Sequence, residues 1–410
     1  MLNKFLKIIE VSEVEKILKD LFNDRYSNHK SENVELECAN HRVLAENINA
    51  TMDLPPFDRA SKDGFAVHAP DTFGATEEEP VILDLLEHID AGQRPQKKIK
   101  PGYCSLINTG APIPEGASGV VMVEYTETRG KKIEIYRPAA PGQFITKQGS
   151  DIKQGDRLLS KGTFITSDKI GALSAMGLKK IPVQEKIKVA IISTGKELVN
   201  SGQDLEYGQI YDVNSYSLRS AVIACGALPV WLGVVPDDYD GLSNIMKDAI
   251  NQSDIVLTSG STSAGTGDVL KDVIENMGEI LVHGISVKPG KPTIVGKINE
   301  KIIIGLPGYP VAALMIFQIF LAPYIRILSG HESNNSIKTA KYPLKERFFS
   351  SKGRLHYALV KIVDEQVYPI FKDSGAIAAL AQAQGYIKIP KNVEILNEET
   401  EVEVYLFDGI

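Results

Sequence analysis

Four short polar or glycine-rich segments, each directly after an apolar run, are the places where this chain could do chemistry. They occupy residues 194–197, 236–238, 259–268 and 306–310. The runs before them are rich in Val and Ile, as buried strands of a parallel sheet are. Because ligands of open α/β sheets bind beyond the carboxyl ends of the strands, we expect the four segments to line one crevice. Glycine and aspartate are also ordinary turn residues, so each segment alone has a purely structural alternative.

The segment 259–268, SGSTSAGTGD, has the composition of an anion-binding loop. Small residues let the backbone approach a ligand closely, and the segment leads into a predicted helix whose N-terminus favours negative charge. A flexible loop without a ligand is the alternative. Asp268 can cap the helix, or it can bind a divalent cation together with Asp237 or Glu197. Carboxylate oxygens at loop ends suit Mg²⁺ that also contacts a substrate phosphate.

Two lysines, Lys288 and Lys291, lie three residues apart in VKPGKP, on a turn that prolines restrain. Two ammonium groups aimed from such a turn suit an oxyanion or a phosphate. A solvated surface turn is the alternative. Nearer the N-terminus, Asp53, Asp58 and Asp63 fall close together in MDLPPFDRASKDGFAV. These three residues are either turn formers or functional acids.

Several other chemistries lack support in the sequence. The histidines form neither HxH nor HExxH, and no Gly-x-Ser-x-Gly elbow, Walker loop or GxGxxG fingerprint is present. Covalent nucleophilic catalysis and dinucleotide binding are therefore not indicated. Cys38, Cys104 and Cys225 are odd in number, far apart and in no CxxC pair, which argues against a disulfide framework and a thiolate zinc site. This cysteine usage suits the cytoplasm, where we expect the protein to act.

Composition and charge place the chain among globular proteins. Its 410 residues are 43% hydrophobic, and 45 Lys and Arg stand against 52 Asp and Glu, for a formal net charge of −7. A mildly acidic chain lacks the basic footprint of a general nucleic-acid binder. The N-terminal stretch carries acids early and has no apolar core typical of a signal peptide. The apolar stretch 310–325 is shorter than the roughly 20 residues of a spanning helix. We therefore expect no nucleic-acid or membrane partner, and a buried or interface helix over 310–325.

Alternating strand and helix patterns from residue 187 onward predict a mostly parallel sheet covered on both faces. Strands are expected at 187–195, 228–235, 253–260 and 302–308, and helices at 217–226, 239–250 and 268–278. The predicted fold class is multi-domain α/β plus β. It has a mixed region over 1–47 and 141–182, a β-rich inserted domain over 48–140, an α/β domain over 183–330, and a small C-terminal β-barrel over 335–410.

Taken together, these motifs resemble those of the molybdopterin molybdenumtransferases, the family of MoeA and the gephyrin E domain. The resemblance covers nearly the whole chain and keeps one order. Its motifs are DLPPFDRASKDGFAV (53–67), TGAPIPEGASGVVMVE (109–124), GQFITKQGSDI (142–152), STGKEL (193–198), GQIYDVNS (208–215), TSGSTSAGTGD (258–268), KPGKP (288–292), LPGYPV (306–311) and the step from Gly353 to Arg354.

The resemblance implies an elongated, four-part protomer that forms a homodimer through the mixed region, with the active site in a molybdopterin-binding α/β domain. It implies that adenylylated molybdopterin and molybdate, or tungstate, react to give the molybdenum cofactor and AMP with Mg²⁺ present. An upstream adenylyltransferase is then an expected partner. The active-site cleft of one protomer would be completed by the β-rich domain of the other.

The resemblance also implies roles for individual residues. Glu197, Asp237 and Asp268 are the acids for the cation and the reacting phosphate. The anion-binding loop contains Ser259, Gly260, Ser263 and Gly265. Asp212 and Asn214 lie near the pterin or nucleotide, with Pro307 and Gly308 of LPGYPV. Molybdate would be bound by Lys288, Lys291, Arg354 and Ser374. Asp63 and Thr109 would act from the β-rich domain.

The chain departs from the family pattern at three places. Ser261 follows Gly260 where a second glycine is usual, Tyr309 replaces an asparagine, and 60–62 reads Ala-Ser-Lys in place of Ser-Ala-Met. Two other functions stay open. One is a scaffold or binding paralogue that keeps the fold without turnover, since fold alone does not decide function. The other is a nucleotide-dependent enzyme acting on another pterin.

Overall fold

The computed structural model describes residues 7–23, 30–260, 268–331, 338–370 and 375–407. The chain divides into two compact units. The larger unit comprises 1–45, 162–166 and 180–410, and the β-rich unit comprises 46–161 and 167–179. The predicted fold class, α/β plus β, is confirmed. The four predicted domain boundaries stay predictions, because both units take residues from the mixed region.

The larger unit is built on a six-stranded sheet with the order β16-β13-β17-β21-β20-β18. Its strands are β13 (Lys188–Thr194), β16 (Leu228–Val235), β17 (Ile255–Ser259), β18 (Glu279–His283), β20 (Ile294–Ile298) and β21 (Lys301–Leu306). The four strands predicted from apolar runs are present and parallel to one another. The antiparallel edge of β20 and β18 was not predicted.

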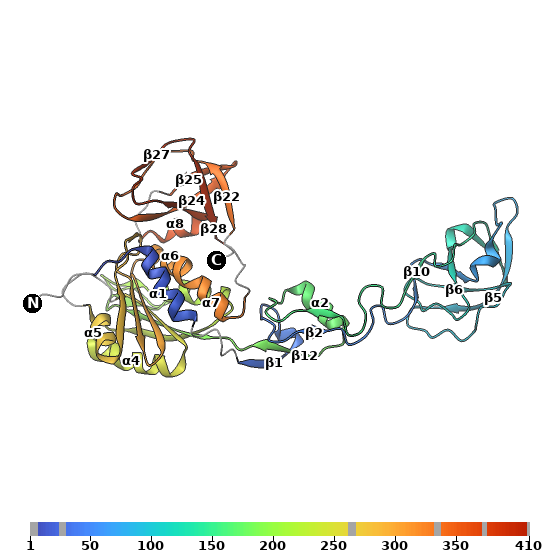
Figure 1. Cartoon of the computed structure of the whole chain (residues 1–410), viewed down its shortest axis with the longest axis horizontal. Coiled ribbons are helices and arrows are strands. Elements are labelled where there is room, and N and C mark those ends of the chain that lie inside the picture. The colour runs from blue at the N-terminus through green and yellow to red at the C-terminus, as the bar shows by residue number, and fades with distance from the viewer. Residues whose placement is uncertain (1–6, 24–29, 261–267, 332–337, 371–374, 408–410) are drawn as a thin grey trace, which may run out of the picture. The chain divides into compact units, whose positions relative to one another are not determined.

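Helices cover both faces of this sheet, as Figure 1 shows. Because side chains alternate along a strand, Val189 and Ile191 point to one helical layer, and Ala190 and Ile192 point to the other. The first layer contains α1 (Val11–Asn23), α3 (Asn214–Ala224), α6 (Pro310–Ile316) and α7 (Ala322–Leu328). The second contains α4 (Tyr239–Gln252) and α5 (Val269–Met277).

The apolar stretch predicted as one helix is interrupted. A π-helical turn, Phe317–Leu321, separates α6 from α7. Pro323 explains the break, because proline has no N–H and its ring displaces the carbonyl of the residue four positions earlier. By length and composition Pro310–Leu328 could cross a membrane, but 67% of its apolar window is buried inside the molecule. A core helix has this property, as predicted.

The C-terminal sheet has the order β19-β24-β26-β28-β22, with β25 paired to β24. Its strands are β19 (Val287–Lys288), β22 (Thr339–Pro343), β24 (Leu355–Val363), β25 (Gln366–Pro369), β26 (Gly385–Ile389) and β28 (Glu401–Leu406). The strand β19 comes from the α/β part and pairs in parallel with β24. Tyr357 and Leu359 of β24 share a hydrophobic core with α6.

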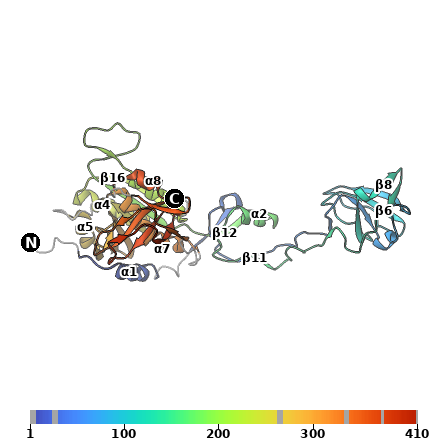
Figure 2. The ribbon, with the colours of Figure 1, turned by 90° about the horizontal axis from the view of Figure 1, so that it is seen from above.

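The β-rich unit contains a sheet with the order β7-β4-β6-β5-β9-β8, part of which is seen from above in Figure 2. Its strands are β4 (Gly64–Val67), β5 (Val81–Ile89), β6 (Tyr103–Ile107), β7 (Gly119–Met122), β8 (Thr126–Arg129) and β9 (Lys132–Ile135). Both faces of the sheet carry apolar side chains, with Phe65 and Val67 in one cluster and Ala66 in another.

Short elements complete the two units. The strand pairs are β1 (Ser31–Glu35) with β12 (Lys180–Gln184), β2 (Ile48–Asn49) with β11 (Arg157–Leu159), β3 (Arg59–Ala60) with β10 (Ile145–Thr146), β14 (Leu198–Val199) with β15 (Ile210–Tyr211), and β23 (Phe348–Phe349) with β27 (Ile395–Leu396). The remaining helices are α2 (Ser167–Ala175) and α8 (Ile377–Gln382).

Candidate active site

The strand order creates a topological switch point between β13 and β17. The chain goes from β13 to β16 on one side and then crosses back to β17 on the other side. Connections that leave a parallel sheet in opposite directions open a crevice at the carboxyl ends of the two strands. The predicted site segments begin at these ends, since β13 ends at Thr194 and β17 at Ser259.

Asn214 ties two of these segments to the start of α3. Its side-chain Nδ2 donates to Ser259 Oγ at 2.6 Å and to the Gly308 carbonyl at 2.7 Å. One amide therefore joins the start of α3, the end of β17 and the turn after β21. Three residues predicted to bind ligand, separated widely in sequence, lie at one place in the structure. Pro307 belongs to the same turn, as the neighbour of Gly308.

Gly260 allows the loop after β17 to pass against the end of β13. Its φ is +105°, and a Cβ at this position would overlap the carbonyl and hydroxyl oxygens of Thr194. Its N–H donates to the Leu306 carbonyl at 3.3 Å. A side chain would therefore be strained and would clash, so glycine is required here. Ser261, Ser263 and Gly265 of the same loop lie outside the described residues.

Hydrogen-bonding capacity remains at the strand ends. Among the described residues, Ser193 Oγ, Thr258 Oγ1 and Asp212 Oδ2 are buried without a hydrogen-bond partner. The other oxygen of Asp212, Oδ1, accepts the Ser215 N–H at 3.1 Å. Unpaired buried polar groups are costly, so such a group calls for an explanation. Ser193 and Thr258 were not predicted, and their only signal is a hydroxyl near the end of an otherwise apolar strand.

Asp268 is the N-cap of α5. Its carboxylate accepts the Lys271 N–H at 3.2 Å and lies 3.1 Å from His283 Nε2, and both side chains of the Asp268–His283 pair are only 11% exposed. Burial raises the pKa of Asp268 above its ordinary value, although the Lys271 N–H and His283 act in the opposite direction. The capping role of Asp268 is confirmed. His283 was missed by the sequence reasoning, because a single histidine at a strand end belongs to no motif.

Glu197 and Asp237 follow the ends of neighbouring strands. The Gly195 N–H donates to the Val235 carbonyl at 3.2 Å, which holds these two ends side by side. Both acids are exposed. The Glu197 carboxylate lies over Gly195, where a Cβ would be 2.7 Å from Glu197 Oε1. Within the ranges that the structure describes, no three His, Cys, Asp or Glu side chains are grouped to hold a metal ion.

The lysine turn lies beside the C-terminal sheet. Lys288 pairs with His356 in the β19–β24 ladder, and the Leu355 N–H donates to the Ser286 carbonyl at 3.3 Å. Arg354, which directly precedes Leu355, is therefore placed next to this turn. Burial and then the charge of Lys288 lower the pKa of His356 to about 4, so that histidine is neutral at pH 7. Ser374 lies outside the described residues.

Lys291 and Gly290 shape the same turn. The Lys291 carbonyl accepts the Ile285 N–H at 2.9 Å, and the Gly290 carbonyl accepts the Thr293 hydroxyl at 2.7 Å. Gly290 has a φ of +108°, and a Cβ there would overlap the Ile316 side chain. The turn is thus fixed against α6, which restrains the backbone of both lysines.

The three acids of the β-rich unit divide into two kinds. Asp53 accepts the Gln154 N–H at 2.8 Å, and Asp58 accepts Lys147 Nζ at 2.7 Å, so both hold loops together. Asp63 accepts the Thr109 N–H at 2.6 Å. This backbone hydrogen bond, with one from the Thr109 side chain, lowers the pKa of Asp63, which is exposed. The structure therefore brings Asp63 and Thr109 together.

Known protein families match most of the chain. Three family models match consecutive parts: "MoeA N-terminal region (domain I and II)" over residues 9–177, "Probable molybdopterin binding domain" over 190–327, and "MoeA C-terminal region (domain IV)" over 341–407.

Individual relatives agree with these models. The molybdopterin molybdenumtransferase of Bacillus subtilis is 34% identical over 92% of this chain and 90% of its own length. Molybdopterin molybdenumtransferase 2 of Mycobacterium tuberculosis is 33% identical over 91% and 94%. The crystal structure of a molybdopterin biosynthesis MoeA protein from Pyrococcus horikosii is similar at a TM-score of 0.84, with 38% identity over 98% of this chain and 100% of that one.

Proposed function

The chain belongs to the MoeA family, and from this premise we propose that it inserts molybdate into adenylylated molybdopterin, forming the molybdenum cofactor and releasing AMP. It acts as a transferase in molybdenum cofactor biosynthesis, as the relatives named molybdopterin molybdenumtransferase do. The scaffold alternative is not favoured, because several relatives that match along nearly their whole length are named molybdopterin molybdenumtransferase.

The observation that carries the proposal is the junction at the switch point. Asn214 binds Ser259 and Gly308 at once, and Gly260 brings the β17 loop against Thr194. A ligand in this crevice would meet backbone and hydroxyl groups from several strand ends. Such a preformed polar rim suits the pterin and phosphate groups of the substrate.

Mg²⁺ is the finer part of the proposal. The acids at these strand ends offer only hard oxygen ligands, which fit this ion, and their small number fits a cation that takes further ligands from substrate phosphate and water. We assign Glu197, Asp237 and Asp268 to it. When bound, the cation would supply charge compensation between phosphate and molybdate. Glu197 and Asp237 follow the neighbouring ends of β13 and β16, whereas Asp268 contacts His283 at the end of β18, the opposite edge strand of the sheet. The assignment of the cation therefore rests first on Glu197 and Asp237.

The oxyanion substrate is assigned to the positive groups of the lysine turn. Lys288, Lys291 and the neighbouring Arg354 bring three cations to one region of the larger unit. Two anionic reactants repel each other, and fixed cations lower that cost without reorganising during the reaction. No protein nucleophile is needed, because the dithiolene sulfurs of the substrate bind the metal.

Other parts of the proposal follow from family membership. They are a homodimer, a cytoplasmic location, an upstream adenylyltransferase as supplier of the substrate, and participation of Asp63 and Thr109 in the reaction. Sedimentation velocity at micromolar concentration tests the first. A monomer under those conditions would contradict the homodimer.

The deciding experiment measures AMP release from adenylylated molybdopterin with purified protein. We expect release to require molybdate or tungstate and to stop when EDTA removes the divalent cation. AMP release that needs no oxyanion would favour an enzyme acting on another pterin. Tight binding of the pterin without release of AMP would favour the scaffold alternative. The concentrations of molybdate and of tungstate that give half-maximal AMP release show which oxyanion the protein prefers.

A further inference from the structure

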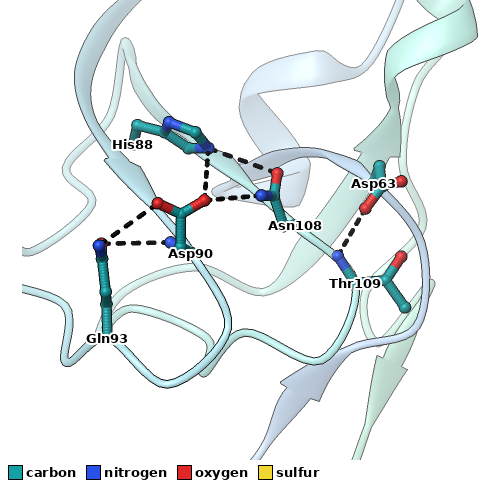
Figure 3. A network of polar contacts seen from close by, with 6 residues as sticks. All are labelled: Asp63, His88, Asp90, Gln93, Asn108 and Thr109. Atoms are coloured by element: carbon teal, nitrogen blue, oxygen red, sulfur yellow. Dashed lines mark hydrogen bonds and ion pairs between the residues drawn. The ribbon is translucent and has the colours of Figure 1, made fainter.

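A hydrogen-bonded network on the β-rich unit lies directly beside Asp63 and Thr109 (Figure 3). We infer that His88 and Asp90 in this network are positioning residues, which act through Asn108 to orient Thr109 and Asp63. The inference rests on the proposed function in so far as Asp63 and Thr109 take part in the reaction.

Thr109 sits in a tight turn whose geometry starts at Asn108. The Ala111 N–H donates to the Asn108 carbonyl at 2.9 Å, and Gly110 has a φ of +84°, so residues 108–111 form a closed β-turn. Thr109 occupies the second position of this turn. The direction of its N–H, which donates to Asp63 at 2.6 Å, therefore depends on how Asn108 is held.

Asp90 holds Asn108. Asn108 Nδ2 donates to Asp90 Oδ1 at 2.7 Å, and the Asn108 N–H donates to the Ile89 carbonyl at 3.2 Å. The side chain and the backbone of Asn108 are thus both fixed by the end of β5. A Cβ at Gly110 would lie 4.0 Å from Ala91 Cβ, so the turn passes close to the residue after Asp90.

His88 and Gln93 hold Asp90 in turn. His88 Nε2 lies 3.2 Å from Asp90 Oδ1 and 3.4 Å from Asn108 Oδ1, while Gln93 Nε2 lies 3.3 Å from Asp90 Oδ2. Both oxygens near His88 Nε2 are acceptors, because the amide nitrogen of Asn108 is used by Asp90. His88 therefore carries a proton on Nε2 and donates, whether the ring is neutral or charged.

Stability alone does not account for this network. The His88 and Asp90 side chains are 49% and 46% exposed, and exposed ion pairs contribute little to folding. The network nevertheless joins three segments of the chain to the turn at 108–111. Its five side chains are those of Asp63, His88, Asp90, Gln93 and Asn108. An orienting role explains this arrangement, since a group that acts in a reaction gains from partners that restrict its motion.

The test needs a variant that removes the Asp90 contact and a control that removes a similar one. We choose Asp90→Ala, and as control Asp84→Ala. Asp84 lies on β5, the strand that Asp90 directly follows, is 49% exposed and pairs with Lys132 at 3.4 Å. His88→Gln keeps a side-chain N–H donor and His88→Leu removes it, so this pair separates hydrogen bonding from bulk.

The first readout is the pKa of Asp63, measured by carboxyl-carbon NMR in the free protein and assigned with Asp63→Asn. We expect this pKa to rise toward the ordinary range of a carboxyl in Asp90→Ala and His88→Leu, and to stay low in Asp84→Ala and His88→Gln. An unchanged Asp63 pKa in Asp90→Ala would overturn the inference.

The second readout is AMP release under the conditions of the proposed function. We expect kcat to fall about tenfold or more in Asp90→Ala, since misplacing a reacting group by about 1 Å can cost up to about a hundredfold, with KM for the pterin little changed. An active wild type with unaffected Asp90→Ala turnover would overturn the positioning role. If the wild type itself releases no AMP, the proposed function fails, and the Asp63 pKa still decides whether the network orients that carboxylate.

Discussion

At the scale of single residues, Asp268 has an observed role and a proposed one, and only the second requires a charge. As the cap of α5 it needs a side-chain oxygen that accepts a backbone N–H, whereas a carboxylate that binds a cation must be ionised. Burial raises its folded-state pKa above the unfolded value. The stability contributed by this group is therefore present below the unfolded pKa and is lost as the pH rises through the folded pKa.

Asp268→Asn separates the two purposes. Asparagine is as good an N-cap as aspartate, and it carries no charge to bury. We expect the free energy of unfolding at pH 7 to be equal or higher than in the wild type, with a flatter acidic pH dependence in chemical denaturation. Mg²⁺-dependent AMP release should fall about tenfold or more, as loss of a charge-assisted contact does. Full activity in this variant would remove Asp268 from the cation site.

Lys288→Ala and Lys291→Ala test the oxyanion assignment. Each removes one charge from a turn that is already fixed, so little else should change. The molybdate midpoint of AMP release should rise about tenfold per lysine, while direct pterin binding changes less. Lys297→Ala is the matched control, because Lys297 pairs with Glu300 beside the start of β21, at the end of the sheet where the parallel strands begin. Weakened pterin binding with an unchanged molybdate midpoint would instead assign the lysines to the pterin phosphate.

At the scale of elements, close backbone approach decides how strands and loops fit together. Gly64, at the start of β4, has no room for a side chain, since a Cβ would overlap the Val121 carbonyl of the paired strand β7. Gly64 also directly follows Asp63. The position of Asp63 is thus set by strand pairing as well as by its hydrogen bond from the Thr109 turn.

Gly64→Ala should destabilise the β-rich unit by about 1–3 kcal/mol, the usual cost of overpacking. Gly171→Ala is the opposite control. Gly171 is in helix α2 with no atom within 4 Å of an added Cβ, so alanine there should stabilise the same unit by about 0.5–1 kcal/mol. Chemical denaturation followed by a probe on each unit measures both. If the two variants have the same free energy of unfolding, strands β4 and β7 can move apart enough to accept an alanine side chain at position 64 without a loss of stability.

At the scale of the whole molecule, the two compact units are joined by a chain that passes between them after residues 45, 161, 166 and 179. Each unit has its own hydrophobic cores. Units of this kind can unfold separately, and a single free energy then does not describe the protein.

We expect scanning calorimetry of the full chain to show two transitions. Gly64→Ala should lower the midpoint of the transition of the β-rich unit and leave that of the larger unit unchanged. The reason is that Gly64 is buried in the β-rich unit. The control is Asp268→Asn, which should affect only the other transition. A single transition that both variants shift would mean that the units unfold as one.

Features that depend on neighbouring residues in the chain could be predicted from the amino-acid sequence. The strands β13, β16, β17 and β21 and the helices between them follow from local periodicity, and the order of the motifs was enough to indicate the family. The capping role of Asp268 was also readable, since a cap needs only the residues that follow it.

Contacts between groups that are distant in the chain became visible only in the folded protein. It joined Asn214 to Ser259 and Gly308, placed Lys288 beside the strand that Arg354 precedes, and paired His283 with Asp268. The network from His88 to Thr109 was invisible for the same reason. Hydrogen bonds between segments far apart in the chain follow no period and need no particular spacing, so nothing in a single sequence marks their partners.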